Sequence, residues 1–550
     1  MKNFMLNSSL TRIGFALLII TLLFMSSMVS IAQTEEKVFR LPSVAGMDNL
    51  DPRVYMANQN VVQTSIFEPL VRIRNGDVFP GLAETWEISD DGLTYTFHLR
   101  DAKWSDGKPI TAGDFVHAFV RMFEICPASQ NLDTIENGPE LRAGECSPEQ
   151  LGAKALDDKT LVMTLRGPTP YFLSQMDYYG YPGREDLVEK YGDEYGASVE
   201  TLASCGPFIL KEWMHEDKLI LEKNPDYWNK DEIKLDKIIV YILPEHQTRR
   251  NMFDNGEIDY YLPISNTEGL EYKDKGMLTT IDKALVRDIT INKHGQNDPV
   301  KAAILSNNNF KKAISYALDR KGFIEQVLGG KGSPATVHAP PAVSIYPGTT
   351  WAEESTNIGK YHPVTADLAK SKEYMDKALE ELGYTSVDEF PEFDFLTSES
   401  FDDPKALTPY WVSVMMDLGL KIKVKPATGA DFWNALYKPA LAFDFARSGW
   451  GGAYDDPMTF MWYWNSESKD KGVTFESKEY DAFLEKANQE RDVKKRAGYI
   501  NQAETLFADT APSIPFMYDK LYLAVQPWVK GIETSTYGLC YKHIYADIVK

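Results

Sequence analysis

The amino-acid sequence predicts an α/β protein whose lobes are built from sheets covered by helices. Short segments in which apolar and polar residues alternate are followed by segments in which apolar residues recur with helical spacing, an order typical of α/β folds. No internal repeat and no linker rich in Gly, Ser or Pro separates the halves of the 550-residue chain. We therefore expect the chain to run back and forth between its lobes and to form discontinuous domains.

The individual elements follow from local patterns. Residues 94–100 and 161–165 alternate as half-buried strands do, and Thr111 with Asp114 forms a capping box that predicts the start of a helix. Further along we expect helices at 310–318, 319–328 and 367–382, a strand at 393–396, a helix that ends at Leu418, a strand at 421–425, a helix near 431–437 and a strand at 443–447.

The N-terminus predicts a secretory signal peptide over residues 1–32. Lys2 and Arg12 precede an apolar run at 13–25, and small residues follow up to Ala32, where we expect cleavage. The apolar run is short for a membrane span, which needs about 20 residues, and an uncleaved anchor is the alternative. No cysteine lies near the cleavage region, so there is no lipobox cysteine for a lipid anchor. We expect a periplasmic protein.

The charge balance argues against two classes of partner. The net charge is −22, and removal of the two basic residues of the signal peptide, which contains no acids, makes it −24. Phosphate binding needs clustered Lys and Arg, so we expect no nucleic-acid partner. The same negative charge argues against anionic membrane surfaces and favours solubility.

The four cysteines leave two alternatives open. Cys126 and Cys146 bracket a polar stretch and could form a disulfide in an oxidising compartment, which would stabilise the fold by about 3 kcal/mol in the chain-entropy model. Free buried thiols are the other alternative. Cys205 and Cys540 lie far apart, and spacing alone does not determine the connectivity.

The sequence contains few parts of a catalytic or metal site. No HExxH, GxSxG or CxxC motif is present, and the eight histidines are dispersed, which argues against a metal centre. Residues 329–333 lack the Lys-Ser/Thr pair of a phosphate loop and are interpreted as a helix stop. Neighbouring acids such as Asp90 and Asp91 point to opposite faces of a strand, so they do not form a two-carboxylate hydrolase site by themselves. We predict a binding protein without a cofactor; a periplasmic hydrolase is the less favoured alternative.

Residues 447–457 have the composition of a binding site. They leave an expected strand and place three glycines, Gly449, Gly451 and Gly452, around Trp450. Glycines let another backbone approach closely, and a Trp offers a flat apolar wall with one N–H donor. The end of a strand with exposed backbone groups can pair an extended peptide as an added strand. A glycine-rich loop around a core Trp is the alternative.

Several motifs occur in a fixed order along the chain. They include Leu50-Asp51-Pro52, Ile66-Phe67-Glu68-Pro69-Leu70, Trp104-Ser105-Asp106-Gly107, Gly206-Pro207-Phe208, Asn224-Pro225-Asp226-Tyr227-Trp228, and Gly449-Trp450 before Tyr454-Asp455-Asp456-Pro457. In this order, and over residues 37–550, the chain resembles the extracytoplasmic solute-binding protein family 5, the substrate-binding proteins of oligopeptide and dipeptide ABC importers.

The resemblance implies a periplasmic-binding-protein-like fold, in which two α/β lobes are joined by two hinge strands and carry an extra, smaller α/β domain. It places domain I at 33–78, 203–290 and 516–550, domain II at 79–202 and domain III at 291–515, with hinge strands near 288–293 and 514–518.

The resemblance also implies a function in transport. A peptide-like solute would bind in the cleft between domains I and III, the lobes would close around it, and the closed form would dock on an ABC permease that works with ATPase subunits. The protein would be a monomer that touches the membrane complex only peripherally. An oligosaccharide or another small solute is the alternative ligand on the same scaffold.

Residue by residue, the resemblance implies which side chains meet the ligand. These are Gly449, Trp450, Gly451, Gly452, Arg447, Tyr454 and Asp455 from domain III, and Tyr55, Met56, Ala57 and Asn58 from domain I. One position departs from the family pattern, because Ala453 stands where relatives that hold a peptide's α-amine commonly have Asp. Asp455 or Asp456 would have to take over that role; otherwise the ligand is capped, internal or not a peptide.

Overall fold

The computed structural model describes residues 35–54, 61–74, 76–263, 265–346, 348–398, 406–437, 440–466, 475–537 and 541–550. The expected signal peptide, the ligand-binding residues expected at Tyr55, Met56, Ala57 and Asn58, and Cys540 lie outside the described residues. The chain from Val38 to Lys550 forms one compact unit, in which strands and helices alternate as the sequence predicts.

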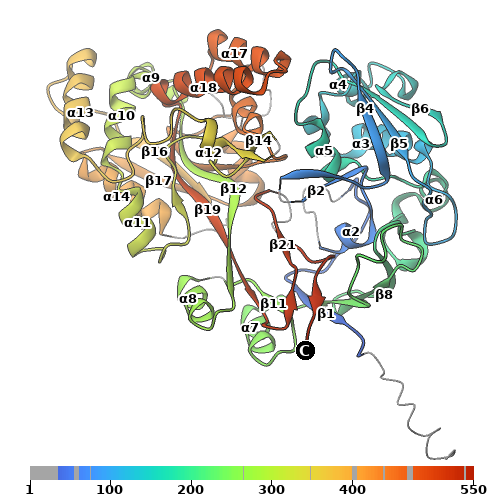
Figure 1. Cartoon of the computed structure of the whole chain (residues 1–550). Coiled ribbons are helices and arrows are strands. Elements are labelled where there is room, and N and C mark those ends of the chain that lie inside the picture. The colour runs from blue at the N-terminus through green and yellow to red at the C-terminus, as the bar shows by residue number, and fades with distance from the viewer. Residues whose placement is uncertain are drawn as a thin grey trace, which may run out of the picture. The chain divides into compact units, whose positions relative to one another are not determined.

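A seven-stranded mixed sheet forms the largest layer of this unit (Figure 1). Its order is β11-β19-β12-β18-β16-β17, and β13 pairs with β19. The strands are β11 (Tyr260–Tyr261), β19 (Ser513–Val525), β12 (Leu278–Ile291), β18 (Phe445–Gly451), β16 (Phe393–Ser398), β17 (Ile422–Ala427) and β13 (Ser333–Pro334).

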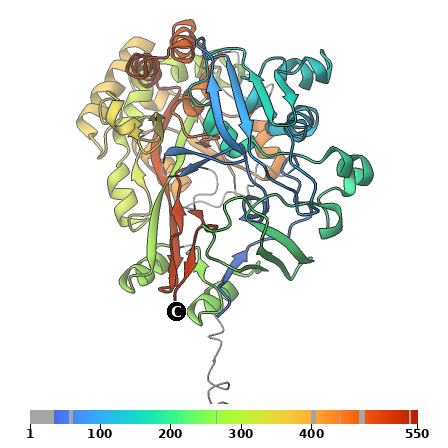
Figure 2. The same ribbon diagram turned by 45° about the vertical axis from the view of Figure 1, so that its right-hand side comes forward.

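The two long strands of this sheet, β12 and β19, are antiparallel neighbours. They are 14 and 13 residues long, and they lie side by side in both views (Figures 1 and 2). The segments expected as hinges, near 288–293 and 514–518, fall on the ends of these strands where β12 also pairs with β18. The division into three domains at the expected boundaries stays a prediction.

Helices cover both faces of the large sheet, and the two-residue period of the strands decides which side chains they bury. Ile289 and Ile291 of β12 pack into one apolar cluster, whereas Val286 packs into another. The first cluster includes residues of α10 (Asn308–Ala317), α13 (Leu368–Leu382) and α14 (Leu407–Asp417), and the second includes residues of α16 (Met458–Met461), α17 (Lys478–Gln489) and α18 (Val493–Thr510).

Two four-stranded sheets lie in the first half of the chain. One consists of β1 (Val38–Ser43), β10 (Lys237–Ile242), β9 (Lys218–Lys223) and β8 (Phe208–Met214), and the other of β4 (Ala83–Ile88), β5 (Thr94–Leu99), β7 (Thr160–Thr164) and β6 (Ala153–Asp157). α3 (Ala112–Ile125) packs against the second sheet and begins with the expected capping box of Thr111 and Asp114.

The elements expected in the second half are confirmed, with small shifts at their ends. Asp319 caps α11 (Arg320–Gln326), and α13 ends at Gly383, which has a φ of 76° that favours glycine. α15 spans Gly429–Leu436, close to the helix expected near 431–437. Within the described residues, no helix combines the length and the apolar character that a membrane crossing requires.

Candidate functional site

The glycine-rich segment belongs to a strand that is paired along only one side. β18 pairs with β12 over its whole length, from Phe445 to Gly451. On the other side, β16 pairs only with Phe445 and Ala446. Among the strands that the structure describes, none is hydrogen-bonded to this side of Gly449 and Gly451, and we call this side of β18 the open edge.

The hydrogen-bond pattern shows which backbone groups point to the open edge. Gly452 N–H donates to Ala284 O on β12 at 2.7 Å. In an antiparallel pair, every second residue bonds to the same neighbouring strand, so the even-numbered residues of β18 bond to β12. The N–H and C=O groups of Arg447, Gly449 and Gly451 therefore point to the open edge.

The glycines of this segment have different physical roles. A Cβ at Gly449 would lie 2.7 Å from Val286 O, a backbone atom that cannot swing away, so the close approach of β12 requires glycine there. A Cβ at Gly451 would have its nearest neighbour at 3.5 Å, an ordinary contact. At Gly452 it would lie 3.2 Å from the Phe460 ring. Only at Gly449 does the backbone itself exclude a side chain.

Trp450 forms a half-buried wall beside the open edge. Its indole N–H donates to Thr459 O at 2.8 Å, and its ring packs on Tyr463 with centroids 4.2 Å apart. The sequence predicted a flat wall with an N–H donor. The wall is present, but its N–H group already donates to Thr459 O, which lies nine residues further along the chain.

The two faces of β18 differ in chemistry. Ser448 and Trp450 point to the side of the sheet that carries Tyr463, and these three residues make up the aromatic face. Arg447 points to the other side, together with Arg287, which lies opposite Gly449 in the register. Arg447 and Arg287 make up the basic face.

Arg447 and Arg287 are both largely buried. Arg287 donates from Nε and Nη2 to Asp519 Oδ2 at 3.2 and 2.7 Å. Arg447 is 5% exposed, and Nη1 donates to Ser398 O, at the end of β16, at 3.4 Å. Burial, with the positive charge of Arg287, lowers the pKa of Arg447 to about 10.

Tyr454 and Asp455, which the sequence assigned to the ligand, have partners inside the protein. The Tyr454 ring stacks on Tyr171 with centroids 4.3 Å apart. Asp455 N–H donates to Ser174 Oγ at 3.0 Å, and its carboxylate accepts bonds from Ser344 N–H at 2.9 Å and from the Ser344 hydroxyl at 2.6 Å. Burial raises the pKa of Asp455.

Asp456 is engaged in the same way. Its oxygens accept bonds from Arg496 Nη1 and Nη2 at 2.9 and 2.7 Å, and both side chains are almost completely buried. Asp455 and Asp456 were the two acids that could replace the one missing at Ala453. Because both already hold internal partners, neither is placed to receive an amine in this structure.

A cavity of about 340 Å³ has Asp455 in its lining. Its lining includes Arg74, Asp282 and Glu533, and Arg74 contacts Glu533 at 2.6 Å and Glu232 at 2.9 Å. Within the described residues, no group of His, Cys, Asp or Glu is arranged to hold a metal ion.

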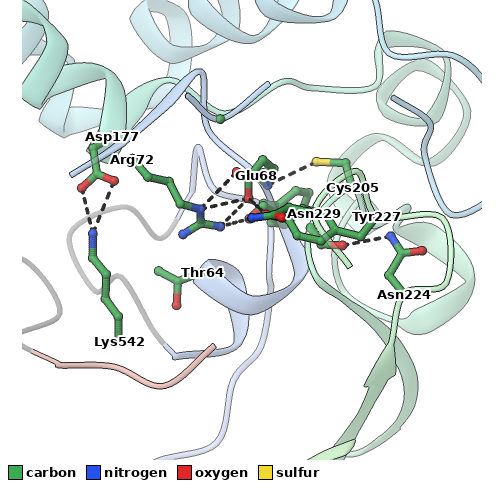
Figure 3. A network of polar contacts seen from close by, with 12 residues as sticks. Thr64, Glu68, Arg72, Asp177, Cys205, Asn224, Tyr227, Asn229 and Lys542 are labelled. Carbon is green, nitrogen blue, oxygen red and sulfur yellow. Dashed lines mark hydrogen bonds and ion pairs between the residues drawn. The ribbon is translucent and has the colours of Figure 1, made fainter. Parts of the chain in front are cut away.

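Glu68, the acid of the motif at residues 66–70, belongs to a buried network of polar side chains (Figure 3). Glu68 accepts bonds from Arg72 Nε at 3.0 Å and from the Tyr227 hydroxyl at 3.1 Å, and Lys542 contacts Asp177 at 3.3 Å. These side chains come from distant parts of the sequence, and each forms a hydrogen bond or an ion pair with another of them. The network therefore fastens the start of β2 (Val71–Arg74) to the rest of the chain.

Cys126 is buried and Cys146 half-buried, and both are thiols in this structure. Cys146 Sγ donates to Asn137 O at 3.6 Å. The disulfide between them stays a prediction.

Sequence reasoning missed three residues of the site: Arg287, Tyr463 and Tyr171. Arg287 gave no distinct signal, because β12 also carries Asp282, Lys283 and Asp288. Tyr463 had a signal, because it stands in an unbroken Trp-Tyr-Trp triplet. Tyr171 gave none, because its partner Tyr454 is remote in the sequence.

Comparisons with known proteins show what the chain is similar to. The family model of bacterial extracellular solute-binding proteins, family 5, matches residues 77–472. An oligopeptide-binding protein of Bacillus subtilis is 31% identical over 491 residues, which cover 86% of this chain and 86% of the relative. A dipeptide-binding protein of the same bacterium is 29% identical over 483 residues, which cover 86% of this chain and 85% of the relative.

A solved structure of Listeria monocytogenes OppA bound to peptide has a similar fold. The TM-score is 0.72 at 26% identity, and the match covers 94% of this chain and 100% of the other.

Proposed function

This chain belongs to the bacterial extracellular solute-binding proteins of family 5, and we propose that it is the solute-binding component of an ABC importer for peptide-like ligands. The relatives from Bacillus subtilis are named as oligopeptide- and dipeptide-binding proteins. The fold is that of periplasmic binding proteins, with two α/β lobes, two hinge strands and an extra α/β domain.

The observation that carries this proposal is the open edge of β18. Gly449 and Gly451 direct backbone donors and acceptors toward a side on which no described strand pairs. An extended peptide is a ligand whose own backbone matches such a row of groups at the spacing of a strand. Trp450 adds an apolar wall beside the same row.

The long strands β12 and β19 support a closing motion. β12 carries one flank of β18, and β19 pairs with β12 along nearly its whole length, so a bend in the two strands moves β18 as a unit. We assign domain I to 33–78, 203–290 and 516–550, domain II to 79–202 and domain III to 291–515. A ligand that contacts domains I and III favours the closed arrangement because only that arrangement offers both sets of contacts.

We further propose export through the N-terminal signal, with cleavage after Ala32, and delivery of the ligand to a permease with its ATPase subunits. The protein acts as a monomer, makes or breaks no bond in its ligand and uses no cofactor.

Capture of ligand tests the proposal directly. Exported protein is purified without refolding, incubated with an equimolar library of tetrapeptides, and analysed by native mass spectrometry. We expect saturable peptide adducts whose masses stay unchanged on long incubation. Binding of an oligosaccharide mixture in place of the peptides would refute the peptide assignment, and cleavage products would refute the assignment as a transport protein.

A further inference from the structure

The start of α5 (Phe172–Tyr179) meets the loop that follows the open edge. The ring of Tyr171, directly before α5, stacks on the ring of Tyr454 with centroids 4.3 Å apart, and the two residues are 7% and 6% exposed. Three residues further along, Ser174 Oγ accepts a bond from Asp455 N–H at 3.0 Å. Tyr171 and Ser174 belong to proposed domain II, whereas Tyr454 and Asp455 belong to proposed domain III. We call these four residues the latch.

The domain III side of the latch is held in place by bonds within its own domain. The Asp455 carboxylate accepts bonds from the backbone N–H and the hydroxyl of Ser344. The next residue, Asp456, forms its buried ion pair with Arg496. Because none of these bonds involves α5, the loop presents the Tyr454 ring and the Asp455 N–H group as a preformed surface.

The other side of the latch is fixed to proposed domain I. Asp177 lies three residues after Ser174 and therefore on the same side of α5. Its carboxylate accepts bonds from Ile73 N–H at 3.0 Å and from the Tyr537 hydroxyl at 3.1 Å. It also contacts Lys542 at 3.3 Å (Figure 3). One helix of domain II is thus bonded both to domain I and to domain III.

Separation of domains II and III has to break the latch. It would expose two tyrosine rings that are almost completely buried, and aromatic side chains bury about 150–250 Å² each. It would also transfer the Asp455 N–H group from Ser174 to water. The hydrophobic effect therefore opposes this separation both with and without a ligand.

We propose that Tyr171 and Ser174 are positioning residues that slow the release of the ligand, because the lobes cannot open until the latch breaks. They act through Tyr454 and Asp455 rather than by contact with the ligand. This inference rests on the proposed function and deepens it, since it gives the extra domain a part in holding the closed arrangement.

Dissociation rates of a bound peptide test this inference. A fluorescein-labelled copy of the tetrapeptide that binds most tightly in the library is displaced by unlabelled peptide in a stopped-flow instrument. We expect about two- to ten-fold faster dissociation in Tyr171→Leu, because an aromatic pair contributes about that factor. Ser174→Ala, which removes the acceptor of Asp455 N–H, should have an effect of the same order. Tyr171→Phe keeps the ring and should restore the slow rate.

Tyr272→Leu is the matched control. Tyr272 is fully buried and packs on Phe253 with ring centroids 5.2 Å apart, but both residues belong to proposed domain I. This change should lower the unfolding temperature and leave the dissociation rate unchanged. The double variant Tyr171→Leu/Tyr454→Leu should release peptide no faster than Tyr171→Leu, because each ring acts only through the other.

Hydrogen exchange gives a second readout that needs no ligand. The Asp455 N–H group is protected while the latch is closed, so its exchange rate in the ligand-free protein reports how often the latch opens. Tyr171→Leu leaves Ser174, the acceptor of this N–H group, in place. We nevertheless expect it to raise the exchange rate at least about two-fold, whereas Tyr171→Phe and Tyr272→Leu should not.

The two proposals fail in different ways. Unchanged dissociation or unchanged exchange in Tyr171→Leu would overturn the inference and leave peptide binding intact. Effects that add up in the double variant would also overturn it, since Tyr454 would then act on the ligand directly. Absence of binding to the tetrapeptide library would overturn the proposed function, and the exchange rates would still test the latch.

Discussion

The close approach of β12 to Gly449 allows one methyl group to displace the open edge. In Gly449→Ala the new Cβ would lie 2.7 Å from Val286 O, whereas ordinary contacts begin near 3.4 Å. Because the obstructing atom belongs to the backbone, the two strands must separate by about 0.7 Å at this point. The N–H and C=O groups of residue 449 move with the strand.

A displacement of this size is large for a hydrogen bond. A shift of β18 away from β12 brings residue 449 closer to a strand at the open edge, so a bond of about 2.9 Å would be compressed by this amount to a distance below the hydrogen-bonding range unless the ligand moves away and gives up the bond. Loss of the two bonds from residue 449, each worth about 0.5–1.5 kcal/mol, weakens ligand binding by about 1–3 kcal/mol, or about 5- to 150-fold.

Gly451→Ala is the matched control, because its Cβ has its nearest neighbour at 3.5 Å and requires no shift. Dissociation constants for the tetrapeptide library are measured for both variants, and the unfolding temperatures without ligand show whether the fold is retained. If both variants bind as tightly as the unaltered protein, the open edge does not pair with the ligand.

Three further predictions concern buried groups. Burial raises the pKa of Asp288 to about 7, so the folded state favours its protonated form; the stability it contributes is present below pH 4 and is lost as the pH rises through 7. Asp288→Asn should therefore raise the free energy of unfolding at pH 8 by up to about 4 kcal/mol, with no gain at pH 4, in urea titrations. Asp456→Asn leaves the buried Arg496 charge without its partner and should cost about 3–5 kcal/mol in the same assay. Tyr171→Leu removes the ring stacked on Tyr454 between proposed domains II and III; peptide affinity measured by titration should fall about two- to ten-fold, and a fall in ligand-free stability alone would contradict this assignment.

Local sequence patterns predict most of the helices and strands, because helix capping and apolar periodicity depend on residues that are close together in the sequence. The capping box at Thr111 and Asp114 predicts the start of α3, and the residue that caps α11, Asp319, was also visible in the sequence. The order of the strands was not available from such patterns. β18 lies between β12 and β16 because of pairings that join residues far apart in the chain, and no local spacing encodes them.

The candidate site was predicted only in part, for a related reason. Gly449 and Trp450 lie on β18 as expected, at the end of an expected strand. The family resemblance places Tyr454 and Asp455 in the same ligand-binding set, yet Asp455 bonds to Ser344 and Ser174, which are 111 and 281 residues away. The sequence shows that an acid is present, but only the fold shows whether it already has a partner.

The open edge begins where β16 and β18 stop pairing. β16 runs beside β18 only as far as Ala446, and Arg447 Nη1 reaches Ser398 O just where β16 ends. Arg447 therefore lies at the point where β16 and β18 stop pairing. We propose that an extended ligand pairs beside Gly449, where no described strand continues from β16. Backbone pairing of this kind is indifferent to the ligand's sequence, so side chains outside the row of backbone donors and acceptors must select the ligand's side chains.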